Sequence, residues 1–144
     1  MASLVGSRVE RKEDKKFLTG RGKYTADVIF AHQTYAYFVR SPHARAKIKN
    51  VDTSKAEKAS GVVGVLTGKD IVNDKIGGLI AGWRIKSEDG SDMKVPAHPP
   101  LASDSVNYVG DHVAVVIAES LDEARNAAEL VKVDYKVLKA VVNT

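Results

Sequence analysis

Residues 38–48, FVRSPHARAKI, place a histidine, three cations and a Ser-Pro turn between two apolar runs. His43 has a side chain that can exchange a proton near neutral pH. Arg40, Arg45 and Lys47 carry clustered positive charge that could hold an anionic ligand. A proline also ends strand pairing, since it donates no backbone hydrogen bond. Three interpretations are therefore open: a catalytic loop, an anion site, or a structural link between strands.

Two glycine-containing segments have part of the pattern of a phosphate-binding loop. Residues 17–24, FLTGRGKY, contain Gly-x-Gly and Gly-Lys, but Thr25 stands where the dinucleotide fingerprint needs a third glycine. Residues 64–70, GVLTGKD, have Asp70 in place of the hydroxyl that holds magnesium in a P-loop. We interpret both segments as turns.

The side chains that could form a catalytic or metal site are few and widely separated. The chain has no cysteine, which excludes thiolate ligands, iron–sulfur ligation and cysteine nucleophiles. Its histidines have neither the helical nor the strand spacing of a local metal site, and no serine lies in a Gly-x-Ser-x-Gly elbow. The four histidines are His32, His43, His98 and His112. We therefore predict no catalytic, cofactor-binding or metal-binding residue on this chain.

The elements that position these residues follow from apolar periodicity. Alternation and β-branched content predict strands over residues 33–39, 46–51, 62–66, 112–118 and 132–137. The first of these strands should be covered on both faces. A short helix is predicted after Asp52, with Gly61 able to take the left-handed position just past its end. A second is predicted after Ser120, whose hydroxyl and Glu123 form a capping-box pattern. Residues 67–70 should open a turn.

Strand, helix and strand therefore occur twice, near 46–66 and 112–137. This pattern predicts an α+β domain with a mixed sheet that contains two strand–helix–strand units. Residues 72–100 lack periodicity, and a loop of that length inside a compact domain is usually functional or packed against another surface. We expect the second.

Composition indicates one domain with a basic N-terminal arm. The 144 residues are 44% hydrophobic, which suffices for a single core. Residues 1–23 hold seven Lys/Arg and three acids, whereas the remainder holds fifteen of each sign. The expected division is thus a basic arm over 1–23 and a domain over 24–144. Acids interrupt the arm and no aromatics alternate with its cations, so we expect no nucleic-acid partner. No run is apolar enough for a membrane span or a signal peptide, so we expect a cytoplasmic protein with no membrane partner.

Read together, four segments resemble the molybdenum hydroxylase family, which includes xanthine dehydrogenase, aldehyde oxidase and carbon monoxide dehydrogenase. The likeness is to the start of the large subunit and covers nearly the whole chain, in the family's order. The segments are residues 6–27, 40–48, 61–70 and 100–135. The chain departs from the usual pattern at His112 and Lys139, where the family commonly has proline.

The resemblance implies the α/β hammerhead fold and a structural role for the Ser-Pro-His-Ala segment. It implies a subunit or domain that packs on a molybdopterin-binding chain or domain and acts as an oxidoreductase only in complex. Molybdopterin with its molybdenum, iron–sulfur clusters and FAD are expected on partner chains or other domains, with an iron–sulfur subunit and a flavin subunit as partners. The alternative is a stand-alone binding module that holds an anionic ligand with the basic loop 40–47.

Overall fold

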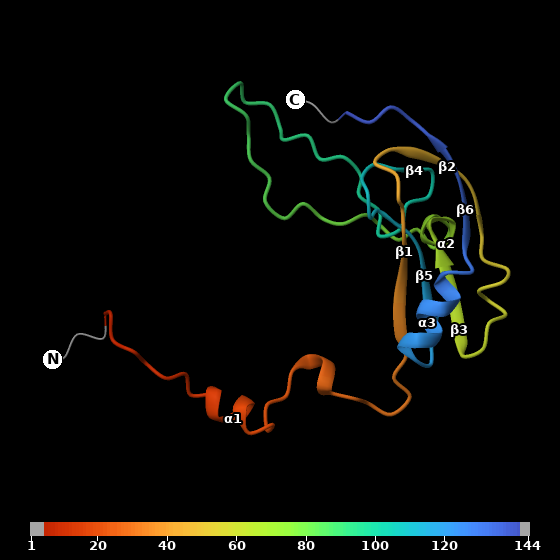
Figure 1. Ribbon diagram of the computed structural model, residues 1–144. Coiled ribbons are helices and arrows are strands. Elements are labelled where there is room, and N and C mark those ends of the chain that lie inside the picture. Colours follow the sequence, from red (N-terminus) through yellow and green to blue (C-terminus); the bar gives the residue numbers. More distant parts are fainter. Residues whose placement is uncertain (1–4, 142–144) are drawn as a thin grey trace. The chain divides into compact units, whose positions relative to one another are not determined.

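The computed structural model describes residues 5–141, which divide into two compact units between Gln33 and Thr34. The first unit contains helix α1 (Asp14–Leu18) and the 3-10 turn η1 (Thr25–Asp27). The second contains all the strands (Figure 1). The elements of the second unit, in chain order, are β1 (Tyr35–Arg40), β2 (Ala46–Asp52), β3 (Val62–Thr67), helix α2 (Gly68–Asn73), β4 (Ser105–Val106), β5 (His112–Ala118), helix α3 (Leu121–Ala128) and β6 (Lys132–Val137). The division into an arm over 1–23 and a domain over 24–144 stays a prediction.

The strands form two three-stranded sheets, with the orders β1-β5-β3 and β4-β2-β6. Every hydrogen-bonded pair in them is antiparallel. In the first sheet β5 is the central strand, and its Val116 lies opposite Tyr37 on one side and Val65 on the other. The α+β class predicted from the sequence is confirmed.

The prediction of one mixed sheet is wrong. The two strands of each strand–helix–strand unit lie in different sheets: β2 pairs with β6, and β3 pairs with β5. The segment that joins the two strands of each unit therefore runs from one sheet to the other. It does not connect two parallel neighbours within one sheet. Antiparallel partners come from distant parts of the chain, which local periodicity does not report.

The core lies on both faces of β5. Val116 is fully buried against Ala127 and Ala128 of α3, which covers the β1-β5-β3 sheet. Val113, on the opposite face, packs with Ala46 of the second sheet. The small side chains of α3 allow its backbone to approach the sheet closely, so a short helix buries one face of the central strand.

Ser120 caps α3 as predicted. Its hydroxyl oxygen accepts a hydrogen bond from the Glu123 backbone N–H at 3.2 Å, and the hydroxyl donates to the Glu123 carboxylate at 2.7 Å. Gly61, under that carboxylate, has a φ of +73°, the left-handed conformation expected of it. The start of α3 and the turn before β3 are thus fixed together.

We expect Ser120→Ala to lower the free energy of unfolding by about 1 kcal/mol, because a helix N–H loses its acceptor. Urea unfolding followed by circular dichroism measures the change. Ser120→Thr, which keeps the hydroxyl, is the control and should lose much less. Equal losses in the two variants would show that the cap contributes nothing.

Two local predictions need correction. Residues 53–60 form successive turns in place of a helix, since Asp52 accepts hydrogen bonds from the backbone and hydroxyl of Ser54 and diverts the chain. Residues 67–70 open helix α2 rather than a simple turn. There the Asp70 carboxylate accepts from the Thr67 N–H and hydroxyl, both at 2.7 Å. β1 also differs from expectation, because Tyr37 and Phe38 are exposed rather than covered on both faces.

Candidate functional site

The Ser-Pro-His-Ala segment forms a rigid corner. The backbone N–H of Ser41 donates to the carbonyl of Asp111 and the N–H of Gly110 donates to the carbonyl of Ser41, both at 2.8 Å. The buried Ser41 hydroxyl oxygen also accepts from the His43 N–H at 3.0 Å. The ring of His43 packs edge-on against Tyr135 at 5.0 Å. These contacts join the end of β1 to the turn before β5, which supports the structural interpretation of the segment.

The cations of the basic loop 40–47 are directed to different places. Arg40 donates from Nη1 to the carbonyl oxygen of Gly110 at 3.2 Å. Arg45 and Lys47 are exposed, and Lys47 lies on β2 of the second sheet, opposite Lys136. The structure thus uses one of the three cations to hold the corner.

A hollow of about 570 Å³ opens beside this corner. The long loop, residues 74–100, forms one wall with apolar side chains. The turn before β5 forms the other wall with polar groups, among them Asn107, Tyr108 and Asp111. Leu79 N–H donates to the His98 carbonyl at 2.8 Å, so the two ends of the long loop are joined at the base of the hollow.

Three side chains determine the polarity of the hollow. Asp111 is 8% exposed, and its carboxylate accepts from the Asn107 N–H at 3.0 Å. The Tyr108 hydroxyl lies 3.3 Å from Nε2 of His98. Burial raises the pKa of Tyr108, and the negative charge of Asp111 raises it further. The tyrosine therefore stays a neutral hydrogen-bonding group, and the arrangement is suited to binding rather than to proton transfer.

His112 lies at the start of β5, and its ring stacks on Phe38 at 4.6 Å. Burial lowers the pKa of His112, and the charge of Arg40 lowers it further, while Asp111 acts in the opposite direction. The neutral imidazole is thus favoured in the folded chain.

We expect stability to fall as the pH drops below about 6.5, the ordinary pKa of histidine in an unfolded chain. Between that value and the lower folded pKa the unfolded chain binds more protons, so the loss levels off below the folded pKa. Urea unfolding at pH 5 to 8 should show this dependence of the free energy of unfolding on pH, and His112→Gln should weaken the dependence. His32→Asn, at an exposed position, is the control. An unchanged slope in the His112 variant would contradict the assignment.

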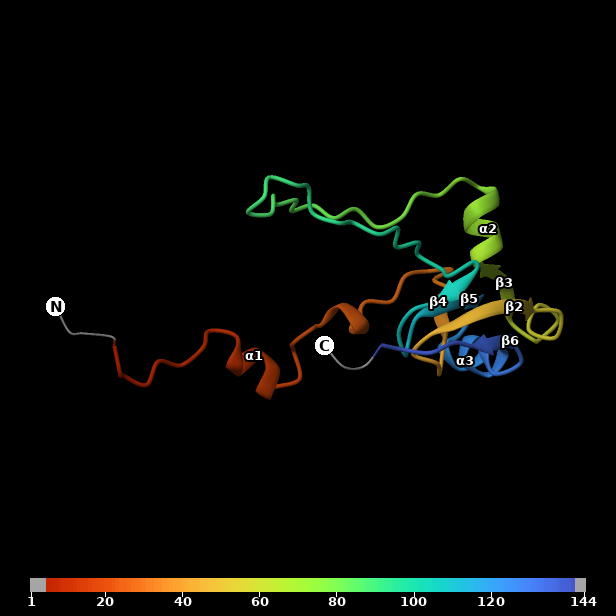
Figure 2. The same cartoon turned by 90° about the horizontal axis from the view of Figure 1, so that it is seen from above.

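The long loop carries several strongly exposed apolar side chains. Ile80 is 90% exposed and Trp83 is 85% exposed. The loop that carries them, between α2 and β4, extends away from the sheets (Figure 2). The other exposed large apolar residues of the loop are Ile76, Leu79, Ile85 and Val95. Its charged residues balance, with Lys75, Arg84, Lys86 and Lys94 against Asp74, Glu88, Asp89 and Asp92. An exposed apolar segment with no net charge is typical of a surface that another protein covers.

Of the two glycine segments, residues 17–24 form a turn after α1 as predicted, whereas residues 64–70 end β3 and begin helix α2, so their interpretation as a turn is wrong. Phe17 and Tyr24 stack at 4.9 Å over Gly22, where a Cβ atom would overlap the phenylalanine ring. Gly68 is buried at the start of α2.

The described residues do not offer a metal site. Between residues 5 and 141, no three His, Asp or Glu side chains lie together as a ligand set, and the sequence has no cysteine. The sequence indicated the long loop but not the hollow at its base, since Asp111 and Tyr108 reach it only through pairing between distant segments.

Comparison with known proteins places this fold. Residues 19–139 match the family described as aldehyde oxidase and xanthine dehydrogenase, a/b hammerhead domain. The chain is 40% identical over 141 residues to the nicotine 6-hydroxylase large subunit of Paenarthrobacter nicotinovorans, covering 98% of this chain and 16% of the relative. It is 36% identical over 141 residues to the carbon monoxide dehydrogenase large chain of Afipia carboxidovorans, covering 96% of this chain and again 16% of the relative.

Solved structures agree. Quinoline 2-oxidoreductase from Pseudomonas putida 86 superposes with a TM-score of 0.82 at 34% identity, over 94% of this chain and 16% of that one. The chain thus spans about a sixth of the length of these relatives. Within residues 5–141, no helix is long and apolar enough to cross a membrane.

Proposed function

The chain belongs to the hammerhead-domain family of aldehyde oxidases and xanthine dehydrogenases, and from this we propose that it is a structural domain of a molybdenum hydroxylase large subunit. It acts by packing on the portion that binds molybdopterin and has no catalytic, cofactor-binding or metal-binding residue of its own. Several relatives are named as subunits or chains of larger enzymes, which supports a role within an assembly.

The observation that carries the proposal is the long loop. A side chain such as Trp83, 85% exposed on an irregular segment, gains nothing from folding of this chain alone. Covering such side chains with a protein surface removes their apolar area from water. The exposed Tyr37 and Phe38 on β1 offer a second apolar area to the same partner.

The proposed assembly is a cytoplasmic oxidoreductase acting on an aldehyde, an N-heterocycle or carbon monoxide. Molybdenum in molybdopterin supplies the oxidation, and iron–sulfur clusters and FAD on the other chains or domains carry the electrons away. The present chain shapes the cofactor-binding portion and its subunit contacts. In this proposal residues 1–23 are a basic arm and residues 24–144 form the domain.

The test is to place an affinity tag on the chromosomal copy and to measure native mass and molybdenum content of the purified protein. We expect a mass far above that of this chain and close to one molybdenum per tagged chain. A metal-free monomer that unfolds cooperatively would refute the proposal and leave the stand-alone binding module.

A further inference from the structure

The segment over residues 5–30, which we call the strap, has no core of its own. Every described side chain in it is exposed, apart from the half-buried position of Gly22. Its large apolar residues are among those exposed. They are Val5, Val9, Phe17, Leu18, Tyr24, Val28, Ile29 and Phe30. A segment that buries so little cannot offset its conformational entropy from its own contacts.

The strap nevertheless has a defined local shape. Phe17 and Tyr24 stack at an interplanar angle of 16°, and Gly22 permits the close approach of the ring. The Asp27 carboxylate accepts from the Tyr24 N–H at 2.9 Å and fixes the next turn. Thr19 closes the end of α1 through its hydroxyl, which donates to the Lys15 carbonyl at 2.6 Å. These contacts order individual turns rather than the whole strap, so only part of the entropy of ordering is lost on association.

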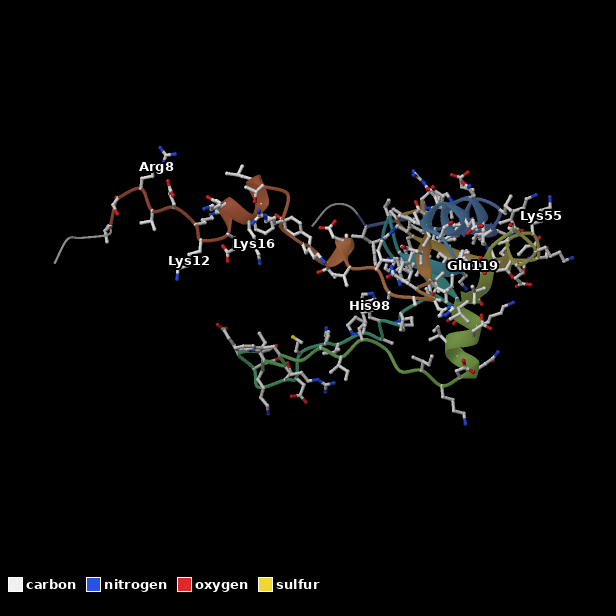
Figure 3. The ribbon with its side chains drawn as sticks, turned by 90° about the horizontal axis from the view of Figure 1, so that it is seen from below. Arg8, Lys12, Lys16, Lys55, His98 and Glu119 are labelled. Carbon is white, nitrogen blue, oxygen red and sulfur yellow. The ribbon has the colours of Figure 1, made fainter. Side chains whose placement is uncertain are left out.

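The strap also concentrates positive charge. A hollow of about 270 Å³ is lined by Lys12, Lys15, Lys16, Thr19 and Arg21. Among the described residues no carboxylate pairs with these four cations. Residues 5–33 hold seven Lys/Arg and four Asp/Glu, which gives +3, and Figure 3 shows Arg8 and Lys12 extending away from the ribbon.

The chemistry of the strap differs from that of the long loop. The long loop is apolar and its charges balance, which suits a permanent contact resembling a domain core. The strap combines apolar groups with unpaired cations, which suits a contact that depends on charge complementarity. Two surfaces of different chemistry indicate two different partners.

We infer that the strap binds an acidic protein surface on another subunit of the assembly, with carboxylates opposite residues 12–21 and apolar groups opposite Phe17 and Leu18. The inference rests on the proposed function. A membrane surface is disfavoured because α1 has five residues, little more than one helical turn, and so offers no extended apolar face to a bilayer. Nucleic acid is disfavoured because the two aromatic rings beside the cations stack on each other rather than on a free base.

The test reverses the charge of the four cations that line the hollow of the strap. The variant chain carries an affinity tag, is expressed from the chromosomal copy and is purified with the complete assembly. The variant is Lys12→Glu/Lys15→Glu/Lys16→Glu/Arg21→Glu. The control reverses four exposed cations of the second unit, as Lys47→Glu/Lys55→Glu/Lys58→Glu/Lys69→Glu. Subunit composition and molybdenum content are measured across a salt series, together with binding to anionic vesicles and to single-stranded DNA.

We expect the strap variant to keep its molybdenum and to lose one further subunit at least about tenfold more readily than the control, with a weaker dependence on salt. Replacing the four cations by Gln should give an intermediate loss. Unchanged subunits and salt dependence would overturn the inference, as would a loss confined to vesicle or DNA binding. Absence of molybdenum from the unmodified protein would instead refute the proposed function.

Discussion

Replacing Gly68 by alanine is expected to lower the free energy of unfolding by about 3 kcal/mol. This is near the upper end of the destabilisation caused by adding volume to a packed interior. Gly68 begins α2 against the segment that leads into β4. A Cβ atom there would overlap the carbonyl oxygen of Ala102 and lie 2.6 Å from the Cα of Ser103. These are backbone atoms, so no side chain can rotate out of the way. The gain in helix propensity from Gly to Ala, at most about 1 kcal/mol, is too small to offset the overlap.

Gly64→Ala is the matched control for this substitution. Gly64 lies on β3, four residues earlier, and an added Cβ would meet nothing within 4 Å. Restricting the unfolded chain should make this variant neutral or slightly more stable. Chemical denaturation of both variants, followed by circular dichroism, gives the comparison. Equal stabilities would contradict the close packing of α2 on the segment after the long loop.

The second large effect is expected only in the assembly. Ile80→Asp/Trp83→Asp places two charges on the exposed part of the long loop. In the isolated chain the free energy of unfolding should change by less than about 0.5 kcal/mol, because both side chains are solvated. In the proposed assembly the same carboxylates would be buried without partners, so molybdenum-containing complex should fall at least about a hundredfold.

The control for the loop variant is Val63→Asp/Leu121→Asp, which changes two exposed apolar residues on β3 and α3. Native mass and molybdenum content of the tagged proteins provide the measurement. The control should assemble normally. If the loop variant assembles as well as the control, the long loop is not the contact with the cofactor-binding portion.

Features set by a few adjacent residues were predictable from the sequence. The strand at 112–118 is confirmed, since a β-branched run buried on both faces needs no knowledge of its partners. The cap at Ser120 and the left-handed Gly61 are confirmed for the same reason, because each depends on residues within one turn. The family resemblance is confirmed by the match over residues 19–139.

Features set by distant pairing were not predictable. The sheet in which β2 or β3 lies depends on β6 and β5, which arrive much later in the chain. The helix predicted over 53–60 failed because two hydrogen bonds from Ser54 to Asp52 compete with helical ones. In the candidate site, the long loop was recognisable by its missing periodicity. The hollow at its base was not, since Asp111 reaches it through the corner that Ser41 closes.

The most direct test of the account is hydrogen exchange of the long loop, compared between the isolated chain and the natural assembly. In the isolated chain, amides of residues 80–85 should exchange as in a solvated loop, while those of β5 are protected. In the assembly we predict exchange of the loop amides at least about a hundredfold slower, with β5 nearly unchanged. Equally fast exchange of the loop in both states would contradict the claim that this domain functions by packing the loop against the cofactor-binding portion.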